Sequence, residues 1–199
     1  FLDLAIADSR IPPEPKEECL IPAKNSAELL SFMIYDAIDF SLISARELNI
    51  QYELANLNEI LEKCVQLIQM QAKKKGLMIL YEFDPSLPKK CRTDPQRLMQ
   101  IVLNLLSNAV KFTFNGTIKL LAEREENLIK ISVIDTGIGM SGSEQKKLKL
   151  ALKNLRDGDK LNINSAGAGL GLKIAQVLAS VLGPNSNKNG IVFEIGRAS

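Results

Sequence analysis

The stretch from Asp94 to Thr113 predicts one long helix with two unequal faces. At about 100° per residue, its apolar side chains gather on one broad face, which consists of Leu98, Ile101, Val102, Leu103, Leu105, Leu106, Ala109 and Val110. An arc of roughly 90° on the other side holds the polar residues Arg97, Gln100, Asn104, Asn108 and Lys111. The pattern predicts a mostly buried helix with one narrow polar stripe.

The polar stripe needs polar partners, because an unsatisfied buried amide is costly. Side-chain amide oxygens suit a hard cation such as Mg²⁺, and cationic side chains suit phosphate. For a single Asn, a hydrogen bond to neighbouring backbone is the simpler explanation. Two amides one turn apart, Asn104 and Asn108, in line with Arg97 and Lys111, favour a site for metal-bound phosphate.

Composition excludes several classes of function. The chain is 46% apolar and 24% charged, which suffices for an ordinary core, and its net charge of +2 argues against nucleic acid or an anionic membrane as the main partner. No apolar run approaches the ~18 residues of a membrane-spanning helix. With no histidine in the chain, Ser/His/Asp and Cys/His catalysis are excluded.

The ends and the cysteines indicate a cytoplasmic portion of a longer protein. The chain opens at Phe1 without an initiator Met or a signal segment, so any membrane anchor of the parent protein is expected elsewhere. Cys19, Cys64 and Cys91 have no CxxC spacing and no histidine to complete a zinc site. We expect reduced thiols in a cytosolic setting.

Two parts of unequal size follow from the periodicity. Residues 1–24 begin with the end of a helix and continue into a proline-rich linker. Residues 25–50 predict an apolar-seamed helix that needs other helices to cover it. A second domain, 51–199, opens with a helix that Asn56 and Glu59 cap and that closes at Gly76, followed by a strand over 77–83. Beyond the central helix, Gly116 leads into a hairpin of two strands, 117–123 and 128–135.

The second hairpin strand ends in a carboxylate that faces inward. Ile129, Ile131 and Val133 share one side-chain row, and Asp135 continues it just before the turn Thr136–Gly139. Asp is also a common turn residue. A buried carboxylate could instead accept a hydrogen bond from the exocyclic amine of adenine, and it would repel the carbonyl that guanine presents there.

Two glycine-rich segments are candidates for a phosphate-binding motif. Residues 137–142 match GxGxxG after a strand, and Asp157 stands about where a dinucleotide-binding unit has its ribose-binding acid. Such a unit needs a second apolar strand before that acid. The sequence before Asp157 is instead helical and lysine-rich, so we reject this interpretation. No GxxxxGK[ST] motif occurs. Residues 167–172 open a helix, so their backbone N–H groups could approach phosphate oxygens.

The stretch DPQRLMQIVLNLLSNAVKFT resembles the asparagine box of sensor histidine kinases, whose ATP-binding domain shares its fold with DNA gyrase, MutL and the heat-shock chaperones. DTGIGM and GAGLGL resemble the two glycine boxes of the same family, in the same order. LLSFMIYDAIDFSLISARELNI resembles the second helix of the dimerisation hairpin, with the triplet Asp39–Phe40–Ser41. The phosphoacceptor histidine would then lie upstream of Phe1.

The resemblance implies an α+β fold: a two-layer α/β sandwich of the Bergerat type, with a mixed sheet, helices on one face and a preceding dimerisation helix. It implies ATP and Mg²⁺ as ligands, a homodimer through helix 25–50, a receiver domain as partner, and no contact with nucleic acid or membrane. Asn108 would ligate Mg²⁺ with Asn104 beside it, and Asp135 would hold adenine. Lys111 and Arg97 would meet phosphates, and Phe112 would line the nucleoside pocket. The lid would span about 141–166, and the pocket and hinges would be shaped by Gly137, Gly139, Gly167, Gly169, Leu170 and Gly171.

Asn104 discriminates within the resembled superfamily. The gyrase, MutL and chaperone ATPases carry a glutamate there that deprotonates water, and an amide cannot accept that proton. The expected activity is therefore transfer of the ATP γ-phosphate to a histidine outside this segment. The alternative is a non-catalytic nucleotide-binding or dimerisation scaffold, since the lid lacks the family's phenylalanine segment and the region between Leu182 and Ile191 is short.

Overall fold

The structure is a computed structural model, and it describes residues 1–45, 47–146, 170–183 and 190–197. A four-stranded mixed sheet has the order β2-β4-β5-β6, formed by β2 (Met78–Phe83), β4 (Thr117–Glu125), β5 (Leu128–Asp135) and β6 (Gly190–Arg197). β2 runs parallel to β4, β4 antiparallel to β5, and β5 parallel to β6. The predicted hairpin and the predicted mixed sheet are confirmed.

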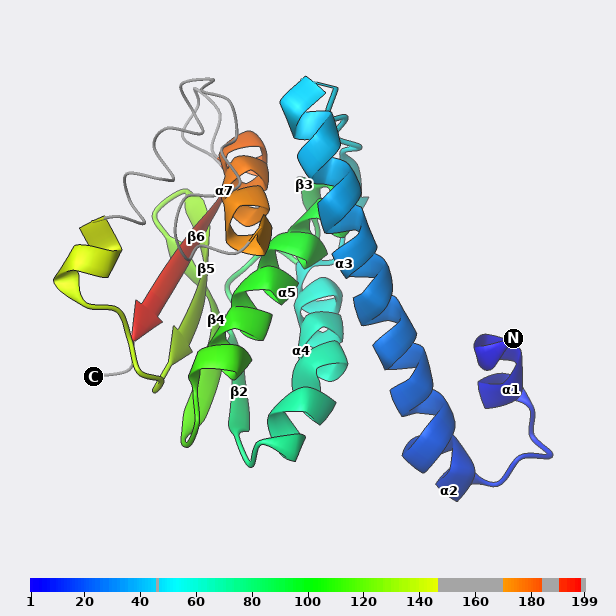
Figure 1. The fold of residues 1–199 in the computed structure, drawn as a ribbon. Helices are drawn as coiled ribbons and strands as arrows, with labels where there is room; N and C mark the ends of the chain where they lie inside the picture. The colour runs from blue at the N-terminus through cyan, green and yellow to red at the C-terminus, as the bar shows by residue number, and fades with distance from the viewer. Residues whose placement is uncertain (46, 147–169, 184–189, 198–199) are drawn as a thin grey trace.

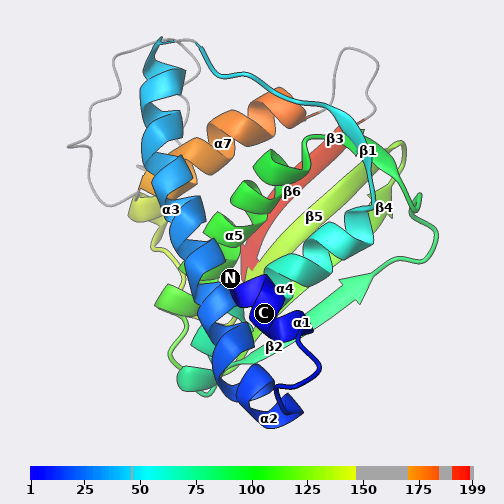
Figure 2. The ribbon, with the colours of Figure 1, turned by 90° about the vertical axis from the view of Figure 1, so that its right-hand side faces the viewer.

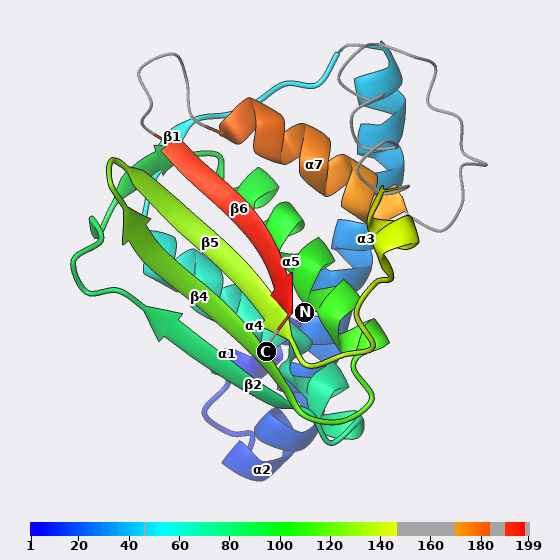
Figure 3. The same cartoon turned by 90° about the vertical axis from the view of Figure 1, so that its left-hand side faces the viewer.

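Three helices, α4 (Leu57–Lys74), α5 (Pro95–Phe112) and α7 (Leu170–Leu182), cover one face of this sheet (Figures 1 and 3). The long helix α3 (Ile21–Ala45) crosses the outer side of that helical layer (Figure 2). The sandwich with helices on one face is therefore confirmed, and α3 adds a further layer.

The predicted apolar face of α5 fills the centre of the core. Leu98, Ile101, Val102 and Leu106 are at most 1% exposed, and so are the inward side chains of the sheet that they meet: Ile118, Leu120, Ala122, Ile131 and Val133. Burial of each such side chain contributes roughly 1.5–3 kcal/mol. The core therefore fixes the rotation of α5 and with it the direction of the polar stripe.

Both ends of α5 are held by other segments. Asp94 caps the helix by accepting a hydrogen bond from the Arg97 backbone N–H (3.1 Å), and its second oxygen accepts one from the Gln51 N–H (2.8 Å). At the other end, Lys75 Nζ donates to the carbonyls of Val110 (2.7 Å) and Lys111 (3.1 Å). Lys75 thus satisfies two helix-terminal acceptors instead of pointing freely into solvent.

The proline-rich segment differs from the predicted linker. After α1 (Leu2–Ala7), helical structure resumes at α2 (Pro13–Pro15) and continues through a π-helical turn, η1 (Lys16–Leu20), into α3. Proline fits the first turn of a helix because the N–H it lacks has no partner there, and the π-turn lies just before Pro22, where the regular ladder is interrupted. The long helix therefore begins before Asn25.

Two smaller expectations also change. Asn56 precedes α4 but makes no side-chain cap; its amide nitrogen donates to Glu59 Oε1 instead (2.8 Å). Two short strands that the sequence did not indicate, β1 (Glu53–Ala55) and β3 (Cys91–Thr93), pair antiparallel.

Gly76 closes α4 at φ +69°, as predicted. Among the described helices, none is both long and apolar enough to cross a membrane.

Candidate functional site

The first glycine turn is packed against the C-terminal end of α5. Asp135, half-buried at the end of β5, accepts a hydrogen bond at Oδ1 from the Gly137 N–H (2.8 Å), and the Ile138 N–H donates to the Phe112 carbonyl (3.3 Å). A Cβ on Gly137 would lie 2.6 Å from the Phe112 oxygen and 2.7 Å from Asp135 Oδ1. Only glycine permits this approach, so the turn, Asp135 and the end of α5 form one unit.

The second oxygen of Asp135 differs from the first. Among the side chains that the structure describes, none donates a hydrogen bond to Oδ2; the side chain of Arg197, the register partner of Asp135 on β6, lies outside them. A half-buried carboxylate with one oxygen fixed and one open can accept a hydrogen bond from an amine that enters the site.

The second glycine segment reaches the polar stripe of α5 at Asn104. A Cβ on Gly171, in the first turn of α7, would lie only 2.2 Å from Asn104 Oδ1. The oxygen of the Asn104 amide therefore faces the N-terminal end of α7. The N-terminal end of a helix has backbone N–H groups without intrahelical partners and a partial positive charge, and both favour anions.

Asn108 and Lys111 lie on the same stripe, nearer the first glycine turn. The Asn108 side chain is half-buried and has no hydrogen-bond partner among the described residues. Lys111 is exposed, with Nζ 5.2 Å from the centre of the Phe112 ring, and Phe112 itself is 43% exposed. The amide, the ammonium group and the ring are thus free to meet a ligand. Gly139 adopts φ +65° in the adjoining turn.

The N-terminal half of the stripe meets α3. Arg97 Nη1 forms an ion pair with Asp39 Oδ2, and it also donates to Gln100 Oε1 (3.0 Å). Gln100 Nε2 donates to Asp36 Oδ1 (2.6 Å) and Asp39 Oδ2 (2.8 Å), and Asn104 Nδ2 donates to Asp36 Oδ1 (3.3 Å). The structure therefore places the Arg97 guanidinium against α3, apart from the glycine turns.

The sequence reasoning missed Asp36, and it named Asp39 only as part of the triplet Asp39–Phe40–Ser41, without a contact to α5. Their spacing of three residues in the C-terminal half of α3 was a signal, because residues three apart share a helix face. Burial raises the pKa of the Asp36 carboxyl, and the charge of Asp39 adds to that rise, while hydrogen bonds from Gln100 and Asn104 oppose it.

Part of the predicted site lies outside the described residues. Gly167, Gly169 and all but the first residues of the lid belong to that part. Leu170 begins α7. Within the described ranges, no group of three His, Cys, Asp or Glu side chains could hold a metal ion, so a metal there would need ligands such as amides and phosphates.

Comparison with known proteins gives the same assignment as the geometry. Residues 93–190 match the family model of the histidine kinase-, DNA gyrase B- and HSP90-like ATPases. The chain is 34% identical over 162 residues to the aerobic respiration control sensor protein ArcB homolog of Haemophilus influenzae, covering 81% of this chain and 49% of that protein. It is also 34% identical over 165 residues to the signal transduction histidine-protein kinase BarA of Escherichia coli, covering 80% and 18%. The chain thus spans half or less of each relative.

Solved structures show the same fold. Full-length ShkA in complex with AMPPNP superposes with a TM-score of 0.62 at 28% identity, covering 78% of this chain and 31% of that chain. The histidine kinase AdeS of Acinetobacter baumannii superposes with a TM-score of 0.57 at 20% identity, covering 91% and 81%.

The residues that match the family model include the amides of α5, Asp135 with its glycine turn, and Gly171 at the start of α7. This chain carries the ATP-binding domain of the sensor histidine kinase family.

Proposed function

We propose that this chain is the ATP-binding catalytic part of a sensor histidine kinase and that it transfers the ATP γ-phosphate to a histidine outside residues 1–199. The observation that carries the proposal is Asn104, an amide set against the first turn of α7. An amide cannot take a proton from water, so this position disfavours hydrolysis. Transfer to an imidazole needs positioning and charge neutralisation, which the surrounding residues can supply.

Asp135 is the proposed adenine-recognition residue. Its Oδ1 is occupied by the Gly137 N–H, which leaves Oδ2 to accept the exocyclic amine. The exposed ring of Phe112 adjoins the same turn through its carbonyl and can line the nucleoside pocket.

The residues present also fit Mg²⁺ and phosphate. The half-buried amide of Asn108 has no partner in the described part of the chain, and its oxygen would hold Mg²⁺ with Asn104 beside it. When bound, the metal would neutralise charge on the phosphates. Lys111 would meet phosphate oxygens, and the glycine segment 167–171 would bring backbone N–H groups close to them.

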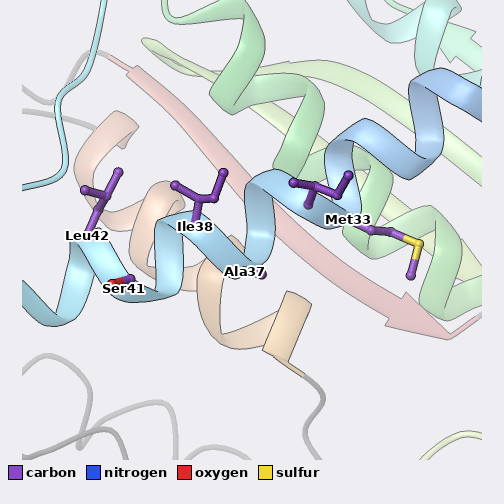
Figure 4. Close-up of a pocket in the computed structure, with 6 residues that line it drawn as sticks. Met33, Ala37, Ile38, Ser41 and Leu42 are labelled. Atoms are coloured by element: carbon purple, nitrogen blue, oxygen red, sulfur yellow. The ribbon is translucent and has the colours of Figure 1, made fainter.

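The proposed partner of α3 is a second copy of this chain. A groove of about 610 Å³ on α3 is lined by apolar and small side chains: Met33, Ile34, Ala37, Ile38, Ser41 and Leu42 (Figure 4). Met33 is 69% exposed and Ile34 is 53% exposed. Apolar surface of this kind is normally covered by a partner, and the carboxylates of α3 face the other way, toward α5. In the assembled protein, a receiver domain would accept the phosphate from the histidine.

The test is phosphorylation of a histidine supplied in trans. The chain is mixed with a polypeptide that contains the first helix of a histidine kinase dimerisation hairpin and with labelled ATP and Mg²⁺. We expect acid-labile phosphate on that polypeptide, lost in Asn108→Ala and Asp135→Ala. The matched controls are Asn127→Ala, in the hairpin turn, and Asp84→Ala, a half-buried carboxylate after β2 that accepts a hydrogen bond from the Ser86 N–H. Absence of acid-labile phosphate with the wild-type chain, despite binding of ATP, would contradict the proposal.

A further inference from the structure

Asn104 touches two helices, and its two amide atoms point to different ones. Nδ2 donates to Asp36 Oδ1 on α3 (3.3 Å), whereas Oδ1 faces Gly171 at the start of α7. Asn104 therefore lies where the dimerisation helix and the candidate nucleotide site meet.

The chemistry of Asp36 determines which amide atom faces α3. An ionised carboxylate only accepts hydrogen bonds, so it can pair with the NH₂ group of an amide and not with its carbonyl oxygen. Gln100 obeys the same constraint: its Nε2 faces Asp36 and Asp39, and its Oε1 accepts from Arg97. All hydrogen bonds of this cluster are therefore consistent with ionised carboxylates at Asp36 and Asp39, which can only accept.

We propose that Asp36 is a positioning residue that turns the carbonyl oxygen of Asn104 toward the place where the proposed function puts the phosphate-bound metal. The inference rests on the proposed function, because that function makes the α7 side the place of the phosphates. Without Asp36, the Asn104 amide could rotate by half a turn and present its NH₂ group to the metal side. The carbonyl oxygen that Asn104 would present beside Asn108 would then be turned away in part of the molecules.

Folding free energy does not explain why a carboxylate stands at position 36. Burial raises its pKa, and Asp39 lies nearby with a second carboxylate, while the cluster offers one guanidinium, that of Arg97. A neutral amide of the same size would avoid the cost of burying that charge. A side chain that lowers the free energy of unfolding but orients a binding group is typical of a functional site.

The first experiment measures the Asn104 amide directly and needs no nucleotide. In the ¹⁵N spectrum of the whole chain, the Asn104 side-chain signal is identified by its absence in Asn104→Ser. We expect its NH₂ protons to be protected from exchange in the wild type and in Glu28→Gln, an acid of the same helix that pairs with Lys63. Protection should be lost in Asp36→Ala. A signal in Asp36→Ala that equals the wild type would overturn the inference.

The second experiment measures the consequence for binding. Calorimetry compares ATP with Mg²⁺ and ATP with EDTA for the wild type, Asp36→Ala, Asp36→Asn and Glu28→Gln. We expect Asp36→Ala to weaken binding of Mg²⁺-ATP about fivefold, the effect of one ordinary hydrogen bond, with a smaller change for metal-free ATP. Asp36→Asn, which can keep or reverse the amide orientation, should fall between Asp36→Ala and the wild type.

These outcomes separate the two proposals. Failure of the wild type to bind ATP would contradict the proposed function, whatever the spectrum shows. Normal binding by the wild type, with an unchanged metal dependence in both Asp36 variants, would overturn the positioning role alone. Should Asp36→Ala not fold, Asp36→Asn decides by the same comparison, because it preserves the size of the side chain.

Discussion

At the scale of single residues, two glycines define the site because a side chain at either position would collide with a functional group. Gly137 lies against Asp135 and the Phe112 carbonyl, and Gly171 lies against Asn104. The conformational freedom of glycine is less important here than the space it leaves, because neither residue has a left-handed φ.

Gly171→Ala should damage both stability and binding. Its Cβ would stand 2.2 Å from Asn104 Oδ1, so α7 or Asn104 must shift. We expect a loss of about 1–3 kcal/mol in the free energy of unfolding, together with weaker binding of Mg²⁺-ATP. Urea unfolding and calorimetry provide the two measurements. Gly142→Ala is the matched control, since a Cβ there has no atom within 4 Å. Equal behaviour of both variants would contradict the packing of α7 on Asn104.

Asp36 predicts a specific dependence of stability on pH. Because burial raises its pKa in the folded protein, the folded state holds the proton more tightly than the unfolded state, whose pKa stays near the ordinary 3.8. The contribution of Asp36 to stability must therefore fall as pH rises from below 3.8 through the raised value. We expect the free energy of unfolding of wild type minus that of Asp36→Asn to decrease over this range and to level off toward neutral pH. Urea unfolding at a series of pH values measures it; a difference that grows with pH would contradict the raised pKa.

At the scale of elements, the contact between α3 and α5 is made through an ion pair and hydrogen bonds of side chains, whereas the face of α5 that packs on the sheet is apolar. Asp39 and Gln100 are each 1% exposed, whereas Asp36, Arg97 and Asn104 at the edge of the cluster are half-buried. The ion pair of Arg97 with Asp39 is therefore a geometric restraint on how α5 lies against α3.

Removing one member of this pair should cost more than removing both. Asp39→Ala leaves the guanidinium of Arg97 without its carboxylate in a buried place, and we expect a loss of about 3–5 kcal/mol. The double variant Asp39→Leu with Arg97→Met should recover a large part of that loss, because no charge then lacks its partner. Urea unfolding of the single and double variants gives the coupling energy. Additive effects would show that the pair does not interact.

The sequence predicted the elements that periodicity controls and missed those that depend on distant partners. The helix over 94–113, the hairpin and the inward row ending at Asp135 follow from local patterns that burial reinforces. The polar stripe was correctly placed on α5, but its alignment could not reveal that Arg97 meets Asp39, because that contact joins residues far apart in sequence. The prolines at 12–15 were interpreted as a helix breaker, although at a first helical turn they are compatible with a helix.

At the scale of the whole molecule, α3 presents two different faces. On one face, Asp36 and Asp39 accept hydrogen bonds from α5, and the other face carries the apolar groove shown in Figure 4. A helix with a buried polar face and an open apolar face needs a further partner, and a second α3 provides the same apolar chemistry.

The dimer proposal predicts a change in mass with little change in folding. Ile38→Arg places a charge in the groove at a side chain that is 48% exposed, so the monomer should tolerate it while the dimer should not. Sedimentation velocity is expected to show a dimer for the wild type and a monomer for Ile38→Arg. Leu80→Arg, on the outer face of the sheet and 40% exposed, is the control and should remain dimeric. A dimeric Ile38→Arg variant would exclude this face as the interface.

The central claim is that this site holds ATP through Asp135 and the amides of α5, and calorimetry with two purine nucleotides tests it most directly. The account predicts that the wild type binds Mg²⁺-ATP and binds Mg²⁺-GTP at least about tenfold more weakly, because the open oxygen of Asp135 accepts from adenine and repels guanine. Asp135→Ala should lose this preference together with most of its affinity for ATP. Equal affinity of the wild type for ATP and GTP, or no binding of either, would contradict the account.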